Sequence, residues 1–452
     1  MLVLSNPSFL NHHIDLLIWA LLTFSIWGNP SHLQYIESQL KEVQVTSSEK
    51  IHIHKTGSHS GYLTYDGIDV NGKRTSDEIW ERTRALEEHG DKVTKLSVVG
   101  YSLGGLIARY AIGILQSQEY FEEIEPINFV AFCSPHVGVL NPVNDRLFVK
   151  AYNLVSPHFL GHTGQQLFLN DKIGNLDGQI FPKPILVWMA DPKSVFFKGL
   201  QSFKHVSLYS NVVNDRRCGW FTAAVSDNDP YHSMTNTSPS NLQVLYLKGY
   251  ELVVIDQETQ VKFVKTKKVH APSLFSKSMK WIKALGNIVL YTPLWSVYFI
   301  ISSIIQRIKV SKRVHAYFRD SKNSLGHLYE YDDDDTFLNN ISRTLSNKVN
   351  DRHDSFIESV NTAINTVDDQ YPEDGEPDSD LVLVLEKPVL NLSPDQQYII
   401  KNLNLLPLKK YAILIHNSKL THAAAIVRYS LPTFDEGKVV VRHFVNEVFK
   451  QE

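Results

Sequence analysis

One serine in this 452-residue sequence lies in a pattern that activates a hydroxyl group for nucleophilic attack. Residues 100–104 read Gly-Tyr-Ser-Leu-Gly, with Ser102 at the centre and a further glycine, Gly105, directly after them. An apolar run rich in β-branched residues enters Gly100, and a helical pattern begins at Leu103. Small residues on both sides let a strand turn sharply into a helix, which exposes the serine hydroxyl at the carboxyl end of a sheet. We therefore predict a nucleophile elbow at Ser102.

A serine hydroxyl needs a base, and the base needs an acid that fixes its tautomer. Where a strand–turn–helix elbow carries the serine, the chain order is serine, acid, histidine. Asp215 follows the apolar strand 206–210 and is the first candidate acid, although it could instead pair with Arg216 or cap a turn. Asp191, which follows the apolar run 185–189, is the second candidate.

Two histidines follow the last apolar strand, where the base is expected. His422 precedes three alanines, whose small side chains would let the backbone approach the serine turn, and we prefer it. His416 is the alternative base, or else a solvated loop residue. Three earlier histidines are interpreted as structural or surface residues: His136, His162 and His205.

Strands and helices alternate around these residues, which predicts an α/β fold with a mostly parallel sheet and helices on both faces. The predicted strands are 16–27, the elbow strand up to residue 100, 127–132, 185–189, 206–210, 381–385 and 411–415, with a short strand at 51–54 and antiparallel hairpins within 243–265. The predicted helices are 30–40, 77–88, 103–115 and one to about 403. Thr75 and Glu78 form the expected capping box of the second, and Ser393 and Gln396 that of the last.

Two segments interrupt this alternation. Residues 141–182 are apolar and punctuated by glycines, which fits either a lid over a lipid-binding cleft or helices packed on the core. Residues 284–305 contain no charge, have a proline near the middle and carry basic residues on both flanks. This pattern favours a hairpin that dips into one leaflet, with a full span or a buried core element as alternatives. The acidic stretches 332–335 and 368–380 are predicted linkers around a polar helical segment, 336–366.

The composition is that of an ordinary folded protein, with 43% hydrophobic residues, 21% charged residues and a net charge of −3. It indicates no nucleic-acid partner. The only two cysteines, Cys133 and Cys218, are predicted to be free thiols of a reducing compartment, with a single disulfide as the alternative. The uncharged run 16–27 is too short to span a bilayer and has no basic residues ahead of it, so we predict a buried first strand rather than a signal peptide.

Four segments together resemble the serine esterase family of lipase-like α/β-hydrolases, and within it the fungal lipid-droplet phospholipase branch. They are residues 100–110, 134–138, 211–216 and 422–428. The resemblance covers most of 16–250 and returns at about 395–430. It implies an α/β-hydrolase fold, hydrolysis of acyl esters in phospholipids or other glycerolipids, and catalysis by Ser102, Asp215 and His422.

One part of the family pattern is changed in this chain. Family members carry a pattern like His-Gly-Leu-Trp-Gly-Asn after the first strand, whereas residues 24–29 here read Phe-Ser-Ile-Trp-Gly-Asn. The backbone of this loop helps to build the oxyanion hole. Leu103 N–H still donates to the hole, and Ile26 N–H would be the second donor. Phe24 and Ser25 therefore indicate either a displaced loop in an impaired enzyme or a misassigned amino terminus.

The sequence thus predicts a serine acyl-ester hydrolase that needs neither metal nor cofactor. Its substrate would be a phospholipid or glycerolipid, reached at a lipid droplet or another cytosol-facing membrane through a monotopic anchor around 284–305. The predicted parts are a hydrolase core (16–265), a membrane-associating and acidic insertion (266–380) and a C-terminal completion of the core (381–452). The alternative function is that of a catalytically impaired, membrane-bound binding protein. Acyl transfer to an acceptor other than water would use the same residues.

Overall fold

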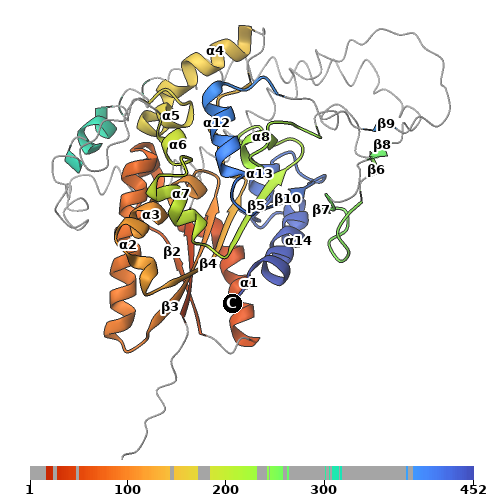
Figure 1. Cartoon of the computed structure of the whole chain (residues 1–452). Coiled ribbons are helices and arrows are strands. Elements are labelled where there is room, and N and C mark those ends of the chain that lie inside the picture. Colours follow the sequence, from red (N-terminus) through yellow and green to blue (C-terminus); the bar gives the residue numbers. More distant parts are fainter. Residues whose placement is uncertain are drawn as a thin grey trace, which may run out of the picture.

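A seven-stranded sheet forms the centre of the molecule (Figure 1). The computed structural model describes residues 17–23, 28–46, 50–142, 147–171, 184–231, 242–243, 245–257, 262–263, 301, 305, 308–314, 316–317, 383–384 and 390–452. In spatial order the strands are β2 (Ile51–Lys55), β1 (Leu17–Thr23), β3 (Val93–Tyr101), β4 (Glu125–Phe132), β5 (His205–Asn211), β10 (Leu408–Ile413) and β7 (Val254–Ile255). The first six are parallel, and β7 is antiparallel to β10.

The pairing of β5 with β10 joins two distant parts of the chain. Tyr411 of β10 lies opposite Tyr209 of β5, and their rings stack with centroids 5.0 Å apart. Because parallel strands end at the same edge of a sheet, the segments that follow β5 and β10 emerge side by side. These are the segments that carry Asp215 and His422.

Helices cover both faces of the sheet (Figure 1). One face packs against α2 (Ile68–Glu88), α3 (Leu103–Ser117), α7 (Val195–Gln201) and α12 (Pro394–Leu403). The other packs against α1 (Gln34–Thr46), α14 (Asp435–His443) and the π-helical turn η9 (Phe444–Val448). Further short helices are η1 (Pro30–Leu33), η2 (Gly61–Tyr65), η3 (Tyr120–Glu122), α8 (Trp220–Ala223), α13 (Thr421–Ala424) and η8 (Pro432–Phe434).

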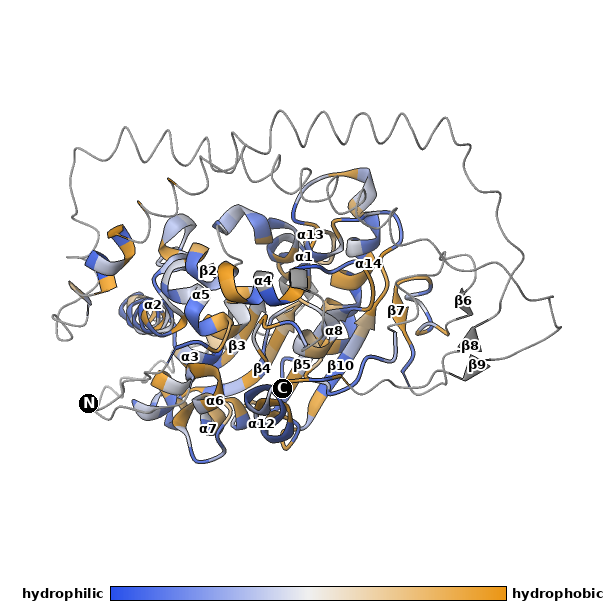
Figure 2. Cartoon of the chain, turned by 90° about the horizontal axis from the view of Figure 1, so that it is seen from above, coloured by the Kyte–Doolittle hydropathy of each residue, from blue (hydrophilic) through white to orange (hydrophobic). Residues whose placement is uncertain are grey.

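The central strands contribute side chains to both layers of the core. On β3, Leu96 and Val98 join the cluster under α2 and α3, whereas Val99 and Tyr101 join the cluster under α1 and α14. This is the two-residue alternation of a strand that is buried on both faces. Figure 2 looks down on the sheet and shows the hydrophobic colour concentrated on these strands. The predicted α/β-hydrolase class, with its mostly parallel sheet, is confirmed.

The apolar run 185–189 does not form the predicted strand. It contains a single helical turn, α6 (Ile185–Trp188), which begins after Pro184. Ile185 N–H donates to the Asp171 carboxylate at 2.8 Å, and Ile185, Leu186 and Val187 are buried. A short apolar run fits a buried helix as well as a buried strand, and this ambiguity explains the wrong prediction.

The helix predicted at 77–88 begins nine residues earlier, since α2 starts at Ile68. Gly72 lies inside this helix. A Cβ at position 72 would come within 2.5 Å of Tyr110 Cδ1 on α3, which explains why a glycine stands in the helix. The expected capping box of Thr75 and Glu78 is therefore wrong. Glu78 instead accepts hydrogen bonds from outside the helix, including one from Gly57 N at 3.0 Å.

The segment that follows β4 contains α4 (Leu147–Val155), η4 (Ser156–Phe159) and α5 (Gly161–Leu167). Buried hydrogen bonds attach α5 to the core: Gly67 N donates to Thr163 Oγ1 at 3.0 Å, and Thr163 Oγ1 donates to Thr64 O at 2.6 Å. For α5, the packed-helix alternative is therefore the correct one. The exposed apolar side chains lie on α4, where Leu154 is 71% exposed.

Several predictions fall partly or wholly outside the described residues. Of the uncharged stretch 284–305, only Ile301 and Ile305 are described, and the acidic and polar segments 332–366 and 368–380 lie outside. No described helix has both the length and the apolar character needed to cross a membrane. The predicted strands at 243–265 and 381–385 are present in part. Three of them form a small antiparallel sheet: β6 (Leu242–Gln243), β8 (Lys262–Phe263) and β9 (Leu383–Val384). The fourth is β7 of the large sheet.

Candidate active site

Ser102 occupies the sharp turn between β3 and α3. Its φ is 56° and its ψ is −126°, a conformation that is costly for a residue with a side chain. Two backbone hydrogen bonds hold the turn: Ser102 N donates to Phe132 O at 2.9 Å, and Gly105 N donates to Ser102 O at 3.1 Å. The residue itself is partly exposed. The strand–turn–helix geometry predicted around the serine is therefore present.

Two glycines make this turn possible. A Cβ on Gly100 would lie 2.5 Å from Gly105 Cα, and a Cβ on Gly105 would overlap Ser134 Oγ and lie 2.6 Å from Ser134 Cβ. The first contact is with backbone and the second with a fully buried side chain. Because neither neighbour can move away cheaply, both positions require glycine.

Asp215 lies in the loop after β5, and its side chain is 2% exposed. Its Oδ2 accepts a hydrogen bond from Asn211 Nδ2 at 2.9 Å, and its Oδ1 accepts the backbone N–H groups of Cys218 at 2.9 Å and Arg217 at 3.1 Å. Burial alone would raise the pKa of Asp215, but His422 and these donors outweigh it and hold the pKa below its usual value. The carboxyl group is therefore ionised at neutral pH.

His422 lies on α13 and meets this carboxylate directly. Its Nδ1 is 2.9 Å from Asp215 Oδ2, and its side chain is 7% exposed. The other ring nitrogen, Nε2, is buried and has no hydrogen-bond partner among the described residues. An ionised carboxylate that accepts the Nδ1 proton leaves Nε2 as the lone-pair nitrogen, which is the form that can accept a proton.

A hydrogen bond ties the histidine to the serine turn. Tyr101, the residue before Ser102, donates its phenolic hydroxyl to His422 O at 3.0 Å, and the two rings lie 5.0 Å apart. No hydrogen bond joins Ser102 Oγ to His422 Nε2, both of which belong to the described part of the chain. Such bonds are often long in ligand-free enzymes and tighten when substrate binds.

The alternative candidates lie elsewhere. Asp191 accepts a hydrogen bond from Tyr398 Oη at 3.1 Å, and the backbone N–H of His416 donates to Glu436 Oε2 at 2.8 Å. His136 is buried; its pKa is held well below the ordinary value by burial and by Arg109, so its ring is neutral.

The other two histidines expected to be structural or surface residues contact residues outside the serine turn. His162 Nε2 is 3.5 Å from Asp69 Oδ2, and His205 Nε2 is 3.3 Å from Glu452 O. Of the candidates, the structure thus brings together Asp215 and His422 beside the turn that carries Ser102.

Cys133 is the neighbour that sequence reasoning missed. Its Sγ and one ligand atom each of Asp215 and His422 all lie within 4.8 Å of one another, and Asn211 Nδ2 donates to the sulfur at 3.2 Å. Burial first, and then the charge of Asp215, raise the pKa of the Cys133 thiol well above its ordinary value. The signal was its place at the end of β4, since neighbouring parallel strands end together. Both cysteines are free thiols, as predicted.

One predicted donor of the oxyanion hole is described. Leu103 is the first residue of α3, and a first-turn amide has no acceptor within its own helix. Residues 24–27, which include Ile26, lie outside the described chain. Just beyond them, Gly28 O accepts from Gly61 N at 2.9 Å, and the Asn29 side chain caps η1.

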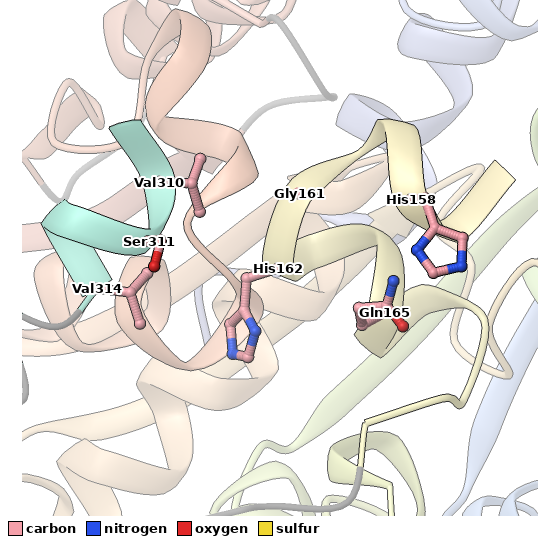
Figure 3. A pocket seen from close by; sticks show the side chains of 7 residues that line it. All are labelled: His158, Gly161, His162, Gln165, Val310, Ser311 and Val314. Carbon is pink, nitrogen blue, oxygen red and sulfur yellow. The ribbon is translucent and has the colours of Figure 1, made fainter. Parts of the chain in front are cut away.

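A cavity of about 360 Å³ lies away from these residues, between α5 and the helical segment 308–314 (Figure 3). His158, Gly161, His162, Gln165, Val310, Ser311 and Val314 line it. Next to it Arg313 forms an ion pair with buried Asp66, with Arg313 Nη2 2.7 Å from Asp66 Oδ1. None of the three candidate catalytic residues reaches this cavity, so it is separate from the serine turn.

Comparison with known proteins gives one consistent result. Residues 17–227 match the model of a family described as “Putative serine esterase (DUF676)”. “Putative lipase C4A8.10” of Schizosaccharomyces pombe is 27% identical over 278 residues, which cover 58% of this chain and 34% of the relative. Two proteins of Saccharomyces cerevisiae also match. “Putative lipase YDL109C” is 29% identical, and the match covers 43% of this chain and 28% of that relative. “Putative lipase ROG1” is 27% identical, and the match covers 46% of this chain and 28% of that relative. The match thus spans about a third or less of each of these relatives.

Proposed function

We propose that this chain, whose residues 17–227 match the serine esterase family model, hydrolyses the acyl esters of lipids. In this proposal Ser102 is the nucleophile, His422 is the base and Asp215 is the acid that orients the base. A hydrolase of ester bonds is what the family description and the lipase names of the relatives support. The residue roles are our proposal. One observation carries them: His422 meets Asp215 through Nδ1 and keeps a buried Nε2 without a partner.

The proposed reaction begins when Ser102 Oγ attacks the acyl carbonyl and His422 Nε2 takes the serine proton. Asp215 holds the imidazole in the correct tautomer and stabilises the imidazolium that forms. Leu103 N–H donates to the oxyanion of the tetrahedral intermediate. His422 then protonates the departing alcohol, and water releases the acyl group from Ser102 by the same route in reverse.

We propose phospholipids or other glycerolipids as substrates and a lipid droplet or other cytosol-facing membrane as the place of action. The relatives bear the name lipase, and the uncharged stretch 284–305 is long enough to enter a bilayer. Three isoleucines are spaced as on one helix face, and each is about half exposed: Ile301, Ile305 and Ile308. A chain lacking 284–305 should keep its activity on a soluble ester but should no longer float with lipid emulsions. Flotation of that shortened chain would refute the anchor.

The decisive experiment labels the full chain with a fluorophosphonate probe and measures fatty-acid release from defined phospholipid and neutral-lipid emulsions. Ser102→Ala should abolish labelling and lower turnover by about 10⁴–10⁶-fold. Ser134→Ala is the matched control, because this nearby serine is buried and should not react. Folded wild-type protein that is neither labelled nor active would instead favour the binding-protein alternative suggested by Phe24 and Ser25.

A further inference from the structure

Three side chains of different chemical type meet beside the serine turn. The Cys133 sulfur, the Asp215 carboxylate and a ring nitrogen of His422 are mutually within 4.8 Å. In the part of the chain that the structure describes, this is the one group of at least three such residues close enough to share an ion. Thiolate, imidazole and carboxylate are the three ligand types that Zn²⁺ binds in proteins.

The spacing is close to what zinc requires. Tetrahedral zinc at about 2.3 Å from one sulfur and about 2.0–2.1 Å from nitrogen and oxygen holds these ligand atoms roughly 3.3–3.6 Å apart. Asp215 Oδ2 and His422 Nδ1 are already at 2.9 Å, and the three atoms need to move by about 1 Å or less to surround an ion. The charges also match, because one thiolate and one carboxylate neutralise a divalent cation in this buried place.

We propose that Cys133, Asp215 and His422 form an inhibitory site for Zn²⁺, which switches off the esterase by capturing its base. Binding of the ion to His422 Nδ1 breaks the hydrogen bond between His422 and Asp215. The ring proton moves from Nδ1 to Nε2. The Cys133 thiol binds as a thiolate and releases one proton to solvent. The imidazole then carries a hydrogen on Nε2 and cannot accept the Ser102 proton. The ion is an inhibitor here and takes no part in the reaction.

Cys133 makes this site possible without belonging to the proposed reaction. It touches the acid–base pair from the end of β4, and none of the steps from serine attack to water release uses its sulfur. Since the thiol proton must leave when the ion binds, inhibition should strengthen as the pH rises. Because the three side chains are almost fully buried, it should also develop during preincubation rather than at once.

The test measures hydrolysis of a soluble ester by the full chain after preincubation with Zn²⁺, and with Mg²⁺ as a hard cation that thiolates bind poorly. Zn²⁺ should inhibit the wild type and Mg²⁺ should not. Loss of a group that merely supports a metal ligand weakens binding about 10–100-fold. Replacing a ligand, as in Cys133→Ser, should therefore raise the zinc concentration for half-inhibition by at least about tenfold. Cys218→Ser, which changes the other buried thiol, should leave that concentration unchanged.

Inhibition depends on the proposed function, whereas metal binding does not, so a second readout separates the two. Co²⁺ in place of Zn²⁺ should give a thiolate-to-metal absorption band in the wild type and in Cys218→Ser, and no band in Cys133→Ser. An inactive wild type that shows the band contradicts the esterase proposal only. Equal zinc inhibition of wild type and Cys133→Ser, or the absence of a thiolate band from the wild type, overturns the zinc site.

Discussion

Two carboxylates of this molecule each lie against a histidine, at opposite sides of the sheet. Asp215 meets His422 beyond the adjacent strands β5 and β10, and Glu78 of α2 meets His54 of β2 with Nε2 and Oε1 2.7 Å apart. The carboxylates are alike in environment, since burial raises the pKa of each and hydrogen bonds from the partners outweigh that effect. Contact between a histidine and a carboxylate is therefore not enough to mark an active site.

The two pairs differ in which ring nitrogen of the histidine contacts the carboxylate and in which further hydrogen bonds the carboxylate accepts. His422 uses Nδ1 and keeps a buried Nε2 without a partner among the described residues, whereas His54 uses Nε2 itself. Glu78 also accepts the backbone N–H groups of Gly57 and Ser58, at 3.0 Å and 3.2 Å, and so fastens the loop after β2 to α2. In the proposed reaction the first pair moves a proton, whereas the second pair holds a loop.

The strongest test of this contrast removes the charge from one carboxylate at a time. Asp215→Asn should lower turnover by about 10⁴-fold, because an amide that donates to Nδ1 forces the hydrogen onto Nε2. Glu78→Gln, the matched change in the other pair, should leave turnover within a few-fold. Kinetics on a soluble ester, with thermal unfolding as a check on folding, would measure both. Equal losses in the two variants would contradict the division of roles.

The depressed pKa of Glu78 should also contribute to stability against acid. The pKa of Glu78 falls from 4.5 to about 2, which corresponds to about 3 kcal/mol of folding free energy. Because the folded-state pKa is the lower one, this stabilisation is complete above pH 4.5 and is lost as the pH falls towards 2. The difference in free energy of unfolding between wild type and Glu78→Gln should therefore shrink by about 3 kcal/mol across that range. A difference that stays constant with pH would show that Glu78 is not held ionised.

A smaller effect is expected at the serine turn, where packing rather than hydrogen bonding sets the geometry. Gly105→Ala forces a Cβ against the buried Ser134 side chain and should cost about 1–3 kcal/mol of stability. Displacement of Ser102 should also weaken fluorophosphonate labelling. Gly57→Ala is the matched control, since a Cβ there meets nothing within 4 Å. A Gly105→Ala protein with wild-type stability and labelling would contradict the steric account of the elbow.

This contrast also explains what the sequence could predict. The serine turn is encoded locally, because Gly100 and Gly105 are required within a few residues of Ser102, so the motif predicted its geometry directly. The sheet could be predicted for a similar reason, since strands buried on both faces form long apolar runs. Order along the chain and strand ends also predicted that Asp215 and His422 come together, and they do. Their catalytic roles stay a prediction.

Other features depend on contacts between distant residues. Glu78 resembled a capping residue because its partners, His54 and Gly57, lie more than twenty residues away in the chain. The start of α2 at Ile68 was missed in the same way, since Gly72 lies inside this helix where a Cβ would meet Tyr110. The short apolar run 185–189 fits a buried helix as well as a buried strand. Cys133 lies close to the acid–base pair because β4, which precedes it, is the neighbour of β5 in the sheet. Each of these requires the three-dimensional neighbour, which local pattern does not contain.

The smallest effect is expected at the histidine that the sequence offered as the alternative base. The contact of His416 with Glu436 is made by its backbone N–H, which a side-chain change leaves in place. His416→Gln should therefore alter stability by no more than about 0.5 kcal/mol and leave turnover unchanged. His422→Gln should remove nearly all activity, because it deletes the imidazole whose Nδ1 meets Asp215 and whose Nε2 has no partner among the described residues. If kinetics showed the larger loss for His416→Gln, the base would have to be reassigned, and the contrast between the two carboxylates would lose its chemical meaning.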